Sequence, residues 1–442
     1  MRSCRALSFG ALTLVLFSSA LAAQDVNRAS APATSTDKIL AGYFEEWSIY
    51  YANFNVANLE RNGVAGKLTH LIYAFANVTP TGCAIADSWA DYQSPYLPSV
   101  NGSPYTGPLY GNFAAMLQLK ALHPNLKIVI SLGGASATNT SAFSKAASTQ
   151  SGRQALASSC IDMFIKGNVA AGVTAPDLFD GINIDWEFPT ASDTQNFTLL
   201  LQEFRSQLGA LTAATGKQYD LSFDGPAGSQ NYTNIDLAQA AAQVDYITID
   251  GYDYAGSWDT VTNHGSPLLD SRNNPNFGQG LSINATVDAY LSAGVPASKY
   301  LMGLPLYGAG WTGVPEKDKG LYQASTGPSP VLNANGIGLC ASISKPSAGC
   351  DTLLTPGLAT YSTLATLNGN GYSHYFDTQR LAAWLYNPTT GTFYTYDDQG
   401  TAFLKMLYID RRQLGGAFVW ALKDDDAYGT IVKTMAIGLG RP

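Results

Sequence analysis

Short apolar runs recur along the whole chain, and the segments between them have the composition and spacing of amphipathic helices. Eight such runs have the length and residue types of strands. They cover 38–44, 69–75, 127–134, 179–187, 219–226, 245–254, 300–308 and 415–422. Strands that alternate with helices are typical of parallel β/α units, so eight units predict an α/β fold, a closed (β/α)8 TIM barrel. An open, doubly wound sheet is the alternative, but no glycine-rich phosphate loop follows the first run.

One interval between runs, from the seventh to the eighth, is much longer than the others. Residues 312–396 are rich in Gly, Pro, Ser, Tyr and Asn, and they include a hairpin-like run around Gly391. A structureless loop of that length is uncommon in a compact fold. We therefore predict a small α+β insertion domain at 312–396 and a barrel formed by 38–311 and 397–442, with the last outer helix resuming near 400–414.

The first 23 residues have the pattern of a secretory signal peptide. They begin with two arginines, continue with an apolar run at about 7–17 and end in an A-x-A type sequence. The apolar run is too short to cross a bilayer as a stable helix. We expect cleavage near residue 23, a lead rich in Ser, Thr and Ala over 24–37, and a mature protein that is secreted and extracellular.

Composition and charge narrow the class of partner. The chain has 442 residues, of which 46% are hydrophobic and 13% charged, which suffices for a large buried core. Its net charge is -8 and it has no long basic run, which disfavours nucleic acid and anionic membranes as partners. We expect a monomer that acts on a neutral or small partner.

Four cysteines remain after removal of the predicted signal peptide: Cys83, Cys160, Cys340 and Cys350. In an oxidising compartment they allow three pairings, and the sequence does not choose among them. The close pair Cys340 and Cys350 is the best candidate for a loop disulfide. A zinc site is disfavoured, because the four histidines and the scattered cysteines lack ligand spacing. We expect neither a metal nor an organic cofactor.

The fourth run, "FDGINIDWEFP" at 179–189, interleaves polar and apolar residues. Side chains alternate between the faces of a strand, so Asn183, Asp185 and Glu187 share one face while Ile182 and Ile184 share the other. In a barrel the isoleucines would pack outward against helices. The three polar groups would line the lumen and approach the C-terminal ends of the strands, where barrel enzymes hold their active sites.

Carboxyl groups in such a row have two interpretations. They could be structural polar groups of the barrel core, but burying ionised groups is costly and Val, Ile and Leu would fill the lumen without that cost. Alternatively, clustered carboxylates raise one another's pKa, so that one of them holds a proton near neutral pH and serves as a general acid. The second interpretation predicts an acid–base enzyme.

"DGINIDWE" resembles the D-x-x-D-x-D-x-E signature of glycoside hydrolase family 18 chitinases. Asp180, Asp185 and Glu187 match that signature, and Asn183 stands where the family usually has its second Asp. Other motifs also resemble those of the family and stand in its order along the chain. They are "SLGG" at 131–134, before the signature, and "GYDYAGSW" at 251–258, "LPLYGAGW" at 304–311 and "GGAFVW" at 415–420, after it. The opening "GYFEEWSIY" and the predicted insertion resemble the deep-cleft branch of the family.

The resemblance implies a chitinase that cuts β-1,4 bonds between N-acetylglucosamine units of chitin or chitooligosaccharides. It also implies substrate-assisted catalysis with net retention, which departs from the usual two-carboxylate scheme. Glu187 would protonate the glycosidic oxygen while the sugar's acetamido carbonyl attacks the anomeric carbon. Asp185 would hold the acetamido N–H, and Tyr252 would bond the acetamido oxygen.

The same resemblance assigns residues that would bind the substrate. Asp253 would bind the sugar, Trp420 would supply an apolar face for its ring, and Trp47 and Trp258 would be stacking platforms along the cleft. Tyr43 and Ser131 would support the inner end of the polar row.

The sequence departs from the family pattern at Asn183, which cannot ionise. Asp224 on the fifth strand and Asp250 on the sixth stand where the family more often has Ala and Met. We hypothesise that one of these two carboxylates replaces the charge missing at Asn183, and that Asn183 still orients Asp185 through a hydrogen bond. Other departures affect binding rather than chemistry: Ala135 for Trp, Ala309 for Arg and Phe188 for Tyr.

Two other functions are compatible with the barrel. A lectin-like protein that binds chitin or glycans without cleaving them would usually lack the acid at position 187, which is present here. An enzyme that cuts the chitobiose core of N-glycans is the other alternative. The predicted insertion argues against it, because an insertion deepens a groove for a linear polymer.

Overall fold

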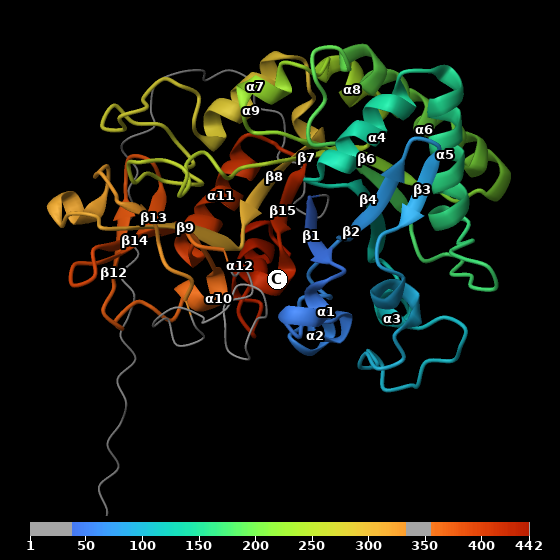
Figure 1. The fold of residues 1–442 in the computed structure, drawn as a ribbon, viewed down its shortest axis with the longest axis horizontal. Helices are drawn as coiled ribbons and strands as arrows, with labels where there is room; N and C mark the ends of the chain where they lie inside the picture. Colours follow the sequence, from blue (N-terminus) through green and yellow to red (C-terminus); the bar gives the residue numbers. More distant parts are fainter. Residues whose placement is uncertain (1–37, 333–354, 442) are drawn as a thin grey trace, which may run out of the picture. The chain divides into compact units, whose positions relative to one another are not determined.

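The computed structural model describes residues 38–332 and 355–441, and these form one compact unit with a closed parallel barrel. The strands of the barrel are β1 (Ile39–Glu45), β2 (His70–Thr79), β4 (Lys127–Gly133), β5 (Gly181–Asp185), β6 (Asp220–Gly225), β7 (Tyr246–Ile249), β8 (Tyr300–Pro305) and β15 (Gly416–Trp420). Strand β1 pairs with both β15 and β2, which closes the barrel (Figure 1). The predicted fold class is confirmed.

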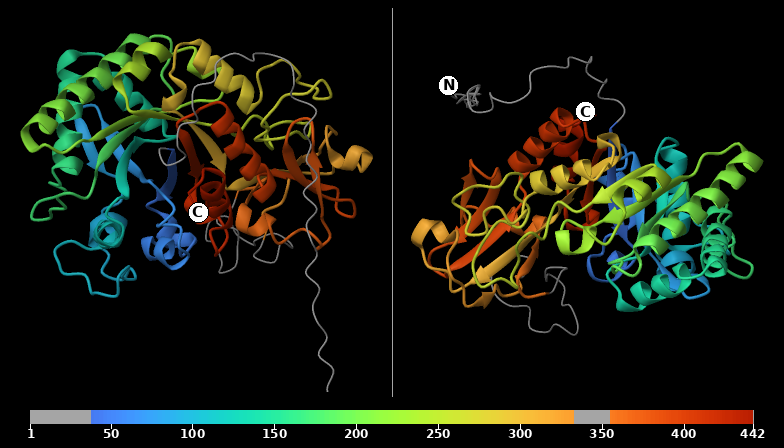
Figure 2. Two further views of the ribbon diagram at one scale, coloured as in Figure 1. Left: turned by 180° about the vertical axis from the view of Figure 1, so that it is seen from behind. Right: turned by 90° about the horizontal axis from the view of Figure 1, so that it is seen from above.

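Helices connect the strands and lie around the outside of the barrel, as the two further views in Figure 2 also show. The longer ones are α2 (Val56–Arg61), α3 (Gly111–Leu122), α4 (Ala137–Ala147), α5 (Gln150–Cys160), α6 (Thr194–Thr215), α8 (Leu237–Gln243), α9 (Ile283–Ser292), α11 (Gln399–Arg411) and α12 (Thr430–Gly438). Their first turns are fixed locally by side-chain caps. Ser136, Thr149, Ser282 and Asp398 accept backbone N–H groups at the starts of α4, α5, α9 and α11.

A second, six-stranded sheet is inserted between the seventh and eighth barrel strands, as predicted. Its strands are β9 (Tyr307–Thr312), β10 (Gly327–Pro328), β11 (Leu358–Thr360), β12 (Ser373–Asp377), β13 (Ala382–Asn387) and β14 (Thr392–Tyr396). The hairpin around Gly391 is the pair β13 and β14, which joins Asn387 to Thr392 in antiparallel register. The sheet begins at Tyr307; the exact domain boundaries at 311 and 397 stay predictions.

Several strand predictions extend too far at their C-terminal ends, and the sixth and seventh runs do so most. Strand β7 ends at Ile249 rather than at 254, and β8 ends at Pro305 rather than at 308. Beyond β7 the backbone leaves the sheet, and Asp253 has a φ of 59°, a left-handed conformation that a strand cannot contain. Residues that looked like strand in the sequence are therefore loop residues at the rim of the barrel.

The core has an outer and an inner part. The outer cluster lies between strands and helices and contains Ile182, Ile184 and Trp186. The inner cluster fills the lumen and includes Ile72, Val129, Leu301 and Phe418. Each large apolar side chain removed from water contributes about 1.5–3 kcal/mol, so the outer cluster is the main source of stability. The predicted alternation of faces along β5 is confirmed.

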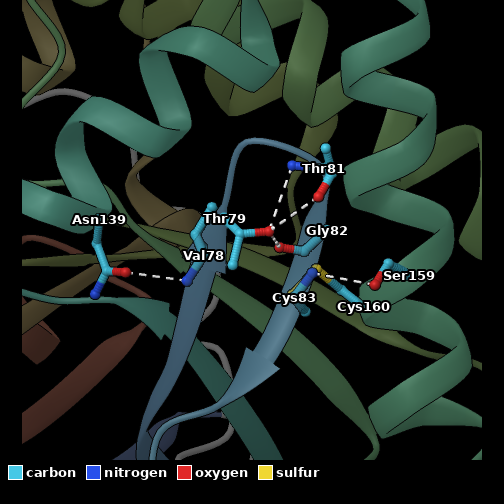
Figure 3. Close-up of a disulfide and its surroundings, with 8 residues drawn as sticks. All are labelled: Val78, Thr79, Thr81, Gly82, Cys83, Asn139, Ser159 and Cys160. Carbon is cyan, nitrogen blue, oxygen red and sulfur yellow. Dashed lines mark hydrogen bonds between the residues drawn. A yellow bond between two sulfur atoms is a disulfide. The ribbon is translucent and has the colours of Figure 1, made fainter.

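A disulfide joins Cys83 to Cys160 and links the outer hairpin strand β3 (Gly82–Ile85) to the end of α5 (Figure 3). The hydroxyl of Ser159 also accepts the N–H of Cys83, at 3.1 Å. The disulfide closes a loop with a sequence separation of 77 residues, and a disulfide typically stabilises a fold by about 2–4 kcal/mol. The proposed Cys340–Cys350 pair lies outside the described residues, as does the predicted signal peptide.

In the two described segments, no helix combines the length and the apolar character that crossing a bilayer requires.

Candidate active site

The lumen-facing residues of neighbouring strands form a buried polar layer around Asn183. The strand registers pair Asn183 with Ser131 on β4 and with Ser222 on β6. The hydroxyls of Ser131 and Tyr43 donate to Asn183 Oδ1 at 2.8 and 3.3 Å, and Asn183 Nδ2 donates to Ser222 Oγ at 3.0 Å. All four side chains are buried, so the amide of Asn183 is satisfied entirely by neutral groups.

The hypothesis that Asn183 orients Asp185 through a direct hydrogen bond is wrong for the described residues, in which the side-chain bonds of Asn183 go to Tyr43, Ser131 and Ser222. Successive lumen-facing residues of one strand are about 6.6 Å apart, whereas laterally paired residues on adjacent strands are about 4.8 Å apart. A short amide therefore bonds sideways across the barrel rather than upward along its own strand.

Replacing Asn183 with alanine is expected to destabilise the fold by about 2–4 kcal/mol. The change would leave buried hydroxyls without partners and open a small cavity. The free energy of unfolding in urea measures this. Asn183→Asp is the comparison variant, since it keeps the shape and the acceptor for Tyr43 and Ser131 but replaces the N–H donor to Ser222 with an acceptor oxygen. An alanine variant as stable as the original would mean that the layer is not held by Asn183.

Above this layer, at the C-terminal ends of the strands, lies a cavity of about 200 Å³. It is lined by Tyr43, Ala135, Asp185, Glu187, Asp224, Asp250, Tyr252, Asp253, Tyr307 and Trp420. The lining thus contains seven of the predicted site residues. It also contains Asp224 and Ala135, two positions at which the sequence departs from the family pattern. The lining contains five carboxyl groups, and none of these described residues is Lys, Arg or His.

Asp185 and Glu187 form the centre of this cavity. Burial is the largest cause that raises the pKa of each, and Glu187 and Asp250 further raise that of Asp185. A hydrogen bond between the two carboxyl groups raises the pKa of Asp185 and lowers that of Glu187, so the two groups titrate as a coupled pair. The Oδ1 atom of Asp185 is buried and has no hydrogen-bond partner among the described residues.

Asp224 and Asp250 add two carboxyl groups on the adjacent strands. Thr248 Oγ1 donates to Asp224 Oδ1 at 3.1 Å and also lies 3.3 Å from the Tyr43 hydroxyl. Asp250 is hydrogen-bonded to Tyr252. Burial raises the pKa of both aspartates, and charge repulsion within the cluster adds to the effect: Asp250 and Asp185 act on Asp224, and Glu187 acts on Asp250.

Tyr307 is a site residue that the sequence argument missed. It follows the seventh strand inside the "LPLYGAGW" motif, and its hydroxyl donates to Asp253 Oδ1 at 2.8 Å. Asp253 is the residue with the left-handed backbone, and such conformations concentrate at functional sites. The "LPLYGAGW" motif is visible in the sequence, but which of its side chains reaches Asp253 depends on where β8 ends.

Aromatic rings form one wall beside the carboxyl groups. Trp420 at the end of β15 lies with its ring centroid 5.2 Å from Tyr43 and 5.8 Å from Phe75. Trp47 extends this row through Phe75, at 5.9 Å. Trp258 is 63% exposed and, like Trp47, is not part of the cavity lining. The roles of these tryptophans as stacking platforms stay predictions.

Ser131 and Asp180 also lie outside the cavity lining, as do Asn183, Trp47 and Trp258. Ser131 is in the polar layer below it, and Asp180 precedes β5 at the opposite end of the barrel strand, where it pairs with Lys120 at 2.8 Å. Across residues 38–332 and 355–441, no group of three or more His, Cys, Asp or Glu side chains is arranged to hold a metal ion. The expected lack of a cofactor stays a prediction.

Comparison with known proteins gives one consistent family. The family model "Glycosyl hydrolases family 18" matches residues 39–425. Chitinase A1 of Niallia circulans is 31% identical over 443 residues, covering 90% of this chain and 58% of the relative. Chitinase C of Streptomyces lividans is 32% identical, with coverage of 90% and 59%. The chain therefore spans less than two thirds of these two relatives.

Other relatives match over most of their length. Chitinase 1 of Aphanocladium album is 31% identical, and the match covers 90% of this chain and 85% of that protein. Among solved structures, the catalytic domain of a psychrophilic chitinase B from Arthrobacter TAD20 has a TM-score of 0.81 and is 33% identical, covering 92% of this chain and 96% of that one.

Proposed function

The chain belongs to the glycosyl hydrolases of family 18, and on that premise we propose that it is a chitinase that hydrolyses β-1,4 bonds between N-acetylglucosamine units. The observation that carries the proposal is the coupled pair of carboxyl groups of Asp185 and Glu187, which lines one cavity together with Tyr252 and Trp420. A carboxyl group that keeps its proton near neutral pH is what protonation of a leaving sugar requires.

In the first step, Glu187 gives its proton to the glycosidic oxygen and the bond from that oxygen to the anomeric carbon breaks. The acetamido carbonyl oxygen of the same sugar forms a new bond to the anomeric carbon from the opposite face, which yields a cyclic oxazolinium ion. Asp185 accepts the acetamido N–H through its unpartnered Oδ1 and offsets the positive charge. Tyr252 donates to the acetamido oxygen and orients it for attack.

In the second step, water attacks the anomeric carbon from the side that the leaving sugar has vacated. Glu187, now a carboxylate, accepts a proton from that water, and the bond between the acetamido oxygen and the anomeric carbon breaks. Two inversions give net retention, and Glu187 ends the cycle protonated. No second protein carboxylate acts as nucleophile, which distinguishes the scheme from that of ordinary retaining glycosidases.

Substrate binding is assigned to the rest of the lining. Trp420 packs on the apolar face of the sugar in the cavity, and Asp253 accepts hydroxyl groups while Tyr307 holds it in position. Trp47 and the exposed Trp258 are proposed to stack on neighbouring sugars along the cleft. Tyr43 and Ser131 act through the polar layer beneath.

The experiment that tests the function is hydrolysis of chitin oligosaccharides, with products followed by ¹H NMR as they form. We expect products that appear first as the β-anomer. First-formed α-anomer would contradict the retaining scheme while leaving the hydrolase intact. If oligosaccharides bind without turnover, the chain is a glycan-binding protein, the alternative that Asn183 keeps open.

We also propose that the protein is secreted, that it is a monomer, and that the insertion domain covers residues 312–396. The arginine-plus-apolar pattern of residues 1–23 supports secretion, and the absence of any long basic run supports a neutral polysaccharide as partner.

The alkaline limb of the pH–rate profile is expected to depend on Asp224 and Asp250. Glu187 raises the pKa of both aspartates through charge repulsion. Where Asp224 or Asp250 is ionised, the same repulsion favours the protonated form of Glu187. Activity needs protonated Glu187 and falls as pH rises through its pKa. Asp250→Asn should therefore move the alkaline limb to lower pH by about one unit.

The measurement is kcat on a chitin tetramer between pH 4 and 10, with Asp224→Asn in parallel. Asp410→Asn, on the exposed face of α11, is the control because it removes the same charge outside the cavity. If neither cavity variant moves the limb or changes kcat, these aspartates do not replace the charge missing at Asn183.

A further inference from the structure

Among the described residues, Asp224 and Asp250 have no cationic partner in the cavity. Three other carboxyl groups of the fold are paired with lysine: Asp397 with Lys405, Glu45 with Lys423 and Asp220 with Lys127. In the cavity, by contrast, Asp224 receives a hydrogen bond from Thr248, and Asp250 is bonded to Tyr252. Both of those partners are neutral. An ionised carboxyl group without a counter-charge is costly in such a site, so a cationic ligand in the cavity would stabilise the ionised form of both aspartates.

The two aspartates face the same part of the cavity as the groups that would hold the C2 substituent of the sugar. Asp250 is hydrogen-bonded to Tyr252. Asp224 lies on the neighbouring strand β6, where it pairs with Thr248 of β7, two residues before Asp250. An acetamido methyl group gains nothing from contact with carboxylates. An ammonium group, by contrast, forms charge-assisted hydrogen bonds with carboxylates, because it has three N–H donors and a positive charge.

Asp185 provides an independent sign of a missing donor. It is 4% exposed, it lines the cavity, and its Oδ1 atom has no hydrogen-bond partner among the described residues. A buried acceptor without a partner is unusual in a folded protein and indicates a donor that arrives with the ligand. An amino group at C2 would lie within reach of this oxygen as well as of Asp224 and Asp250.

We propose that the cavity also binds sugars that carry a free amino group at C2, namely β-1,4-linked glucosamine units, with the ammonium group held by Asp224 and Asp250. The inference rests on the proposed function, because it takes the cavity to be the site of the sugar whose bond is cleaved. Glucosamine has no acetamido carbonyl to attack the anomeric carbon. Bound there, it is a competitive, unreactive ligand, and the two aspartates determine which C2 substituents are accepted.

The direct test uses Glu187→Gln, in which turnover is expected to be about 10²–10⁴-fold slower. The variant is titrated by calorimetry with a glucosamine tetramer and with an N-acetylglucosamine tetramer. Adding Asp224→Asn or Asp250→Asn should weaken binding of the glucosamine tetramer at least about tenfold and that of the acetylated tetramer less than about threefold, since a charge-assisted bond is lost only in the first case. Asp410→Asn is the control for non-specific attraction of a cation to an acidic protein.

A second measurement needs no variant in the cavity. With the unmodified chain and the acetylated tetramer as substrate, the glucosamine tetramer should raise KM without changing kcat, and added salt should weaken this inhibition. Equal weakening of both tetramers by the aspartate variants, or inhibition that Asp410→Asn relieves as strongly, would overturn the inference. A chain that neither binds nor hydrolyses the acetylated tetramer would instead refute the proposed function.

Discussion

Glu187→Gln is expected to lower kcat on chitin oligosaccharides by about 10²–10⁴-fold while KM changes little. Glutamine has nearly the same shape but no proton to give to the glycosidic oxygen, and it cannot take one from the attacking water. The leaving sugar would depart as an unprotonated alkoxide, which is a poor leaving group. Because Glu187 lies just beyond the end of β5 and is only partly buried, the substitution should leave the fold unchanged.

The measurement is the initial rate of tetramer cleavage, with thermal unfolding of the same sample as a check on folding. Glu316→Gln is the matched control, because it makes the same chemical change at an exposed residue outside the cavity lining. A Glu187→Gln variant that retains most of the rate would mean that another carboxyl group of the cluster is the acid. Asp253 and Asp250 would then be tested in turn.

Periodicity predicted the barrel well because it depends only on which face of a strand is buried. The alternation of Asn183 and Asp185 with Ile182 and Ile184 decides which side faces the lumen, whatever the neighbouring strands contain. Strand ends were harder, since β7 stops at Ile249 although "DGYDY" continues with strand-like residues. The backbone turns there to direct Tyr252 and Asp253 into the cavity.

The contents of the site were predictable where a motif fixed them, as for Asp185, Glu187, Tyr252 and Trp420. What the sequence could not give are contacts between distant strands. The bonds of Asn183 to Ser131 and Ser222 follow from the lateral register of three strands, and Phe75 joins Trp47 to Trp420 from a fourth element. Such neighbours are set by barrel closure, which no local pattern encodes.

The same limitation hides a buried ion pair that links the inserted sheet to the barrel. Lys405 on α11 is fully buried, and its Nζ lies 2.5 to 2.7 Å from both carboxylate oxygens of Asp397, which follows the last strand of the insertion. It also donates to Ser266 Oγ at 2.6 Å, and Ser266 donates to the backbone oxygen of Gly251, beside Tyr252. One charge therefore connects the insertion, an outer helix and the loop that carries a site residue.

Lys405→Met is expected to reduce the free energy of unfolding by about 3–5 kcal/mol, because it leaves the carboxylate of Asp397 buried without its partner. The double variant Lys405→Met, Asp397→Asn should recover part of this loss, since it removes the uncompensated charge as well. Urea unfolding measures both.

Lys166→Met is the control for loss of a lysine. Its ion pair with Asp162 is half exposed, and such pairs are worth at most about 1 kcal/mol. If Lys405→Met cost no more than Lys166→Met, the buried ion pair would contribute little to stability. A large loss that the second substitution partly reverses would instead show that this ion pair helps to hold the insertion on the barrel.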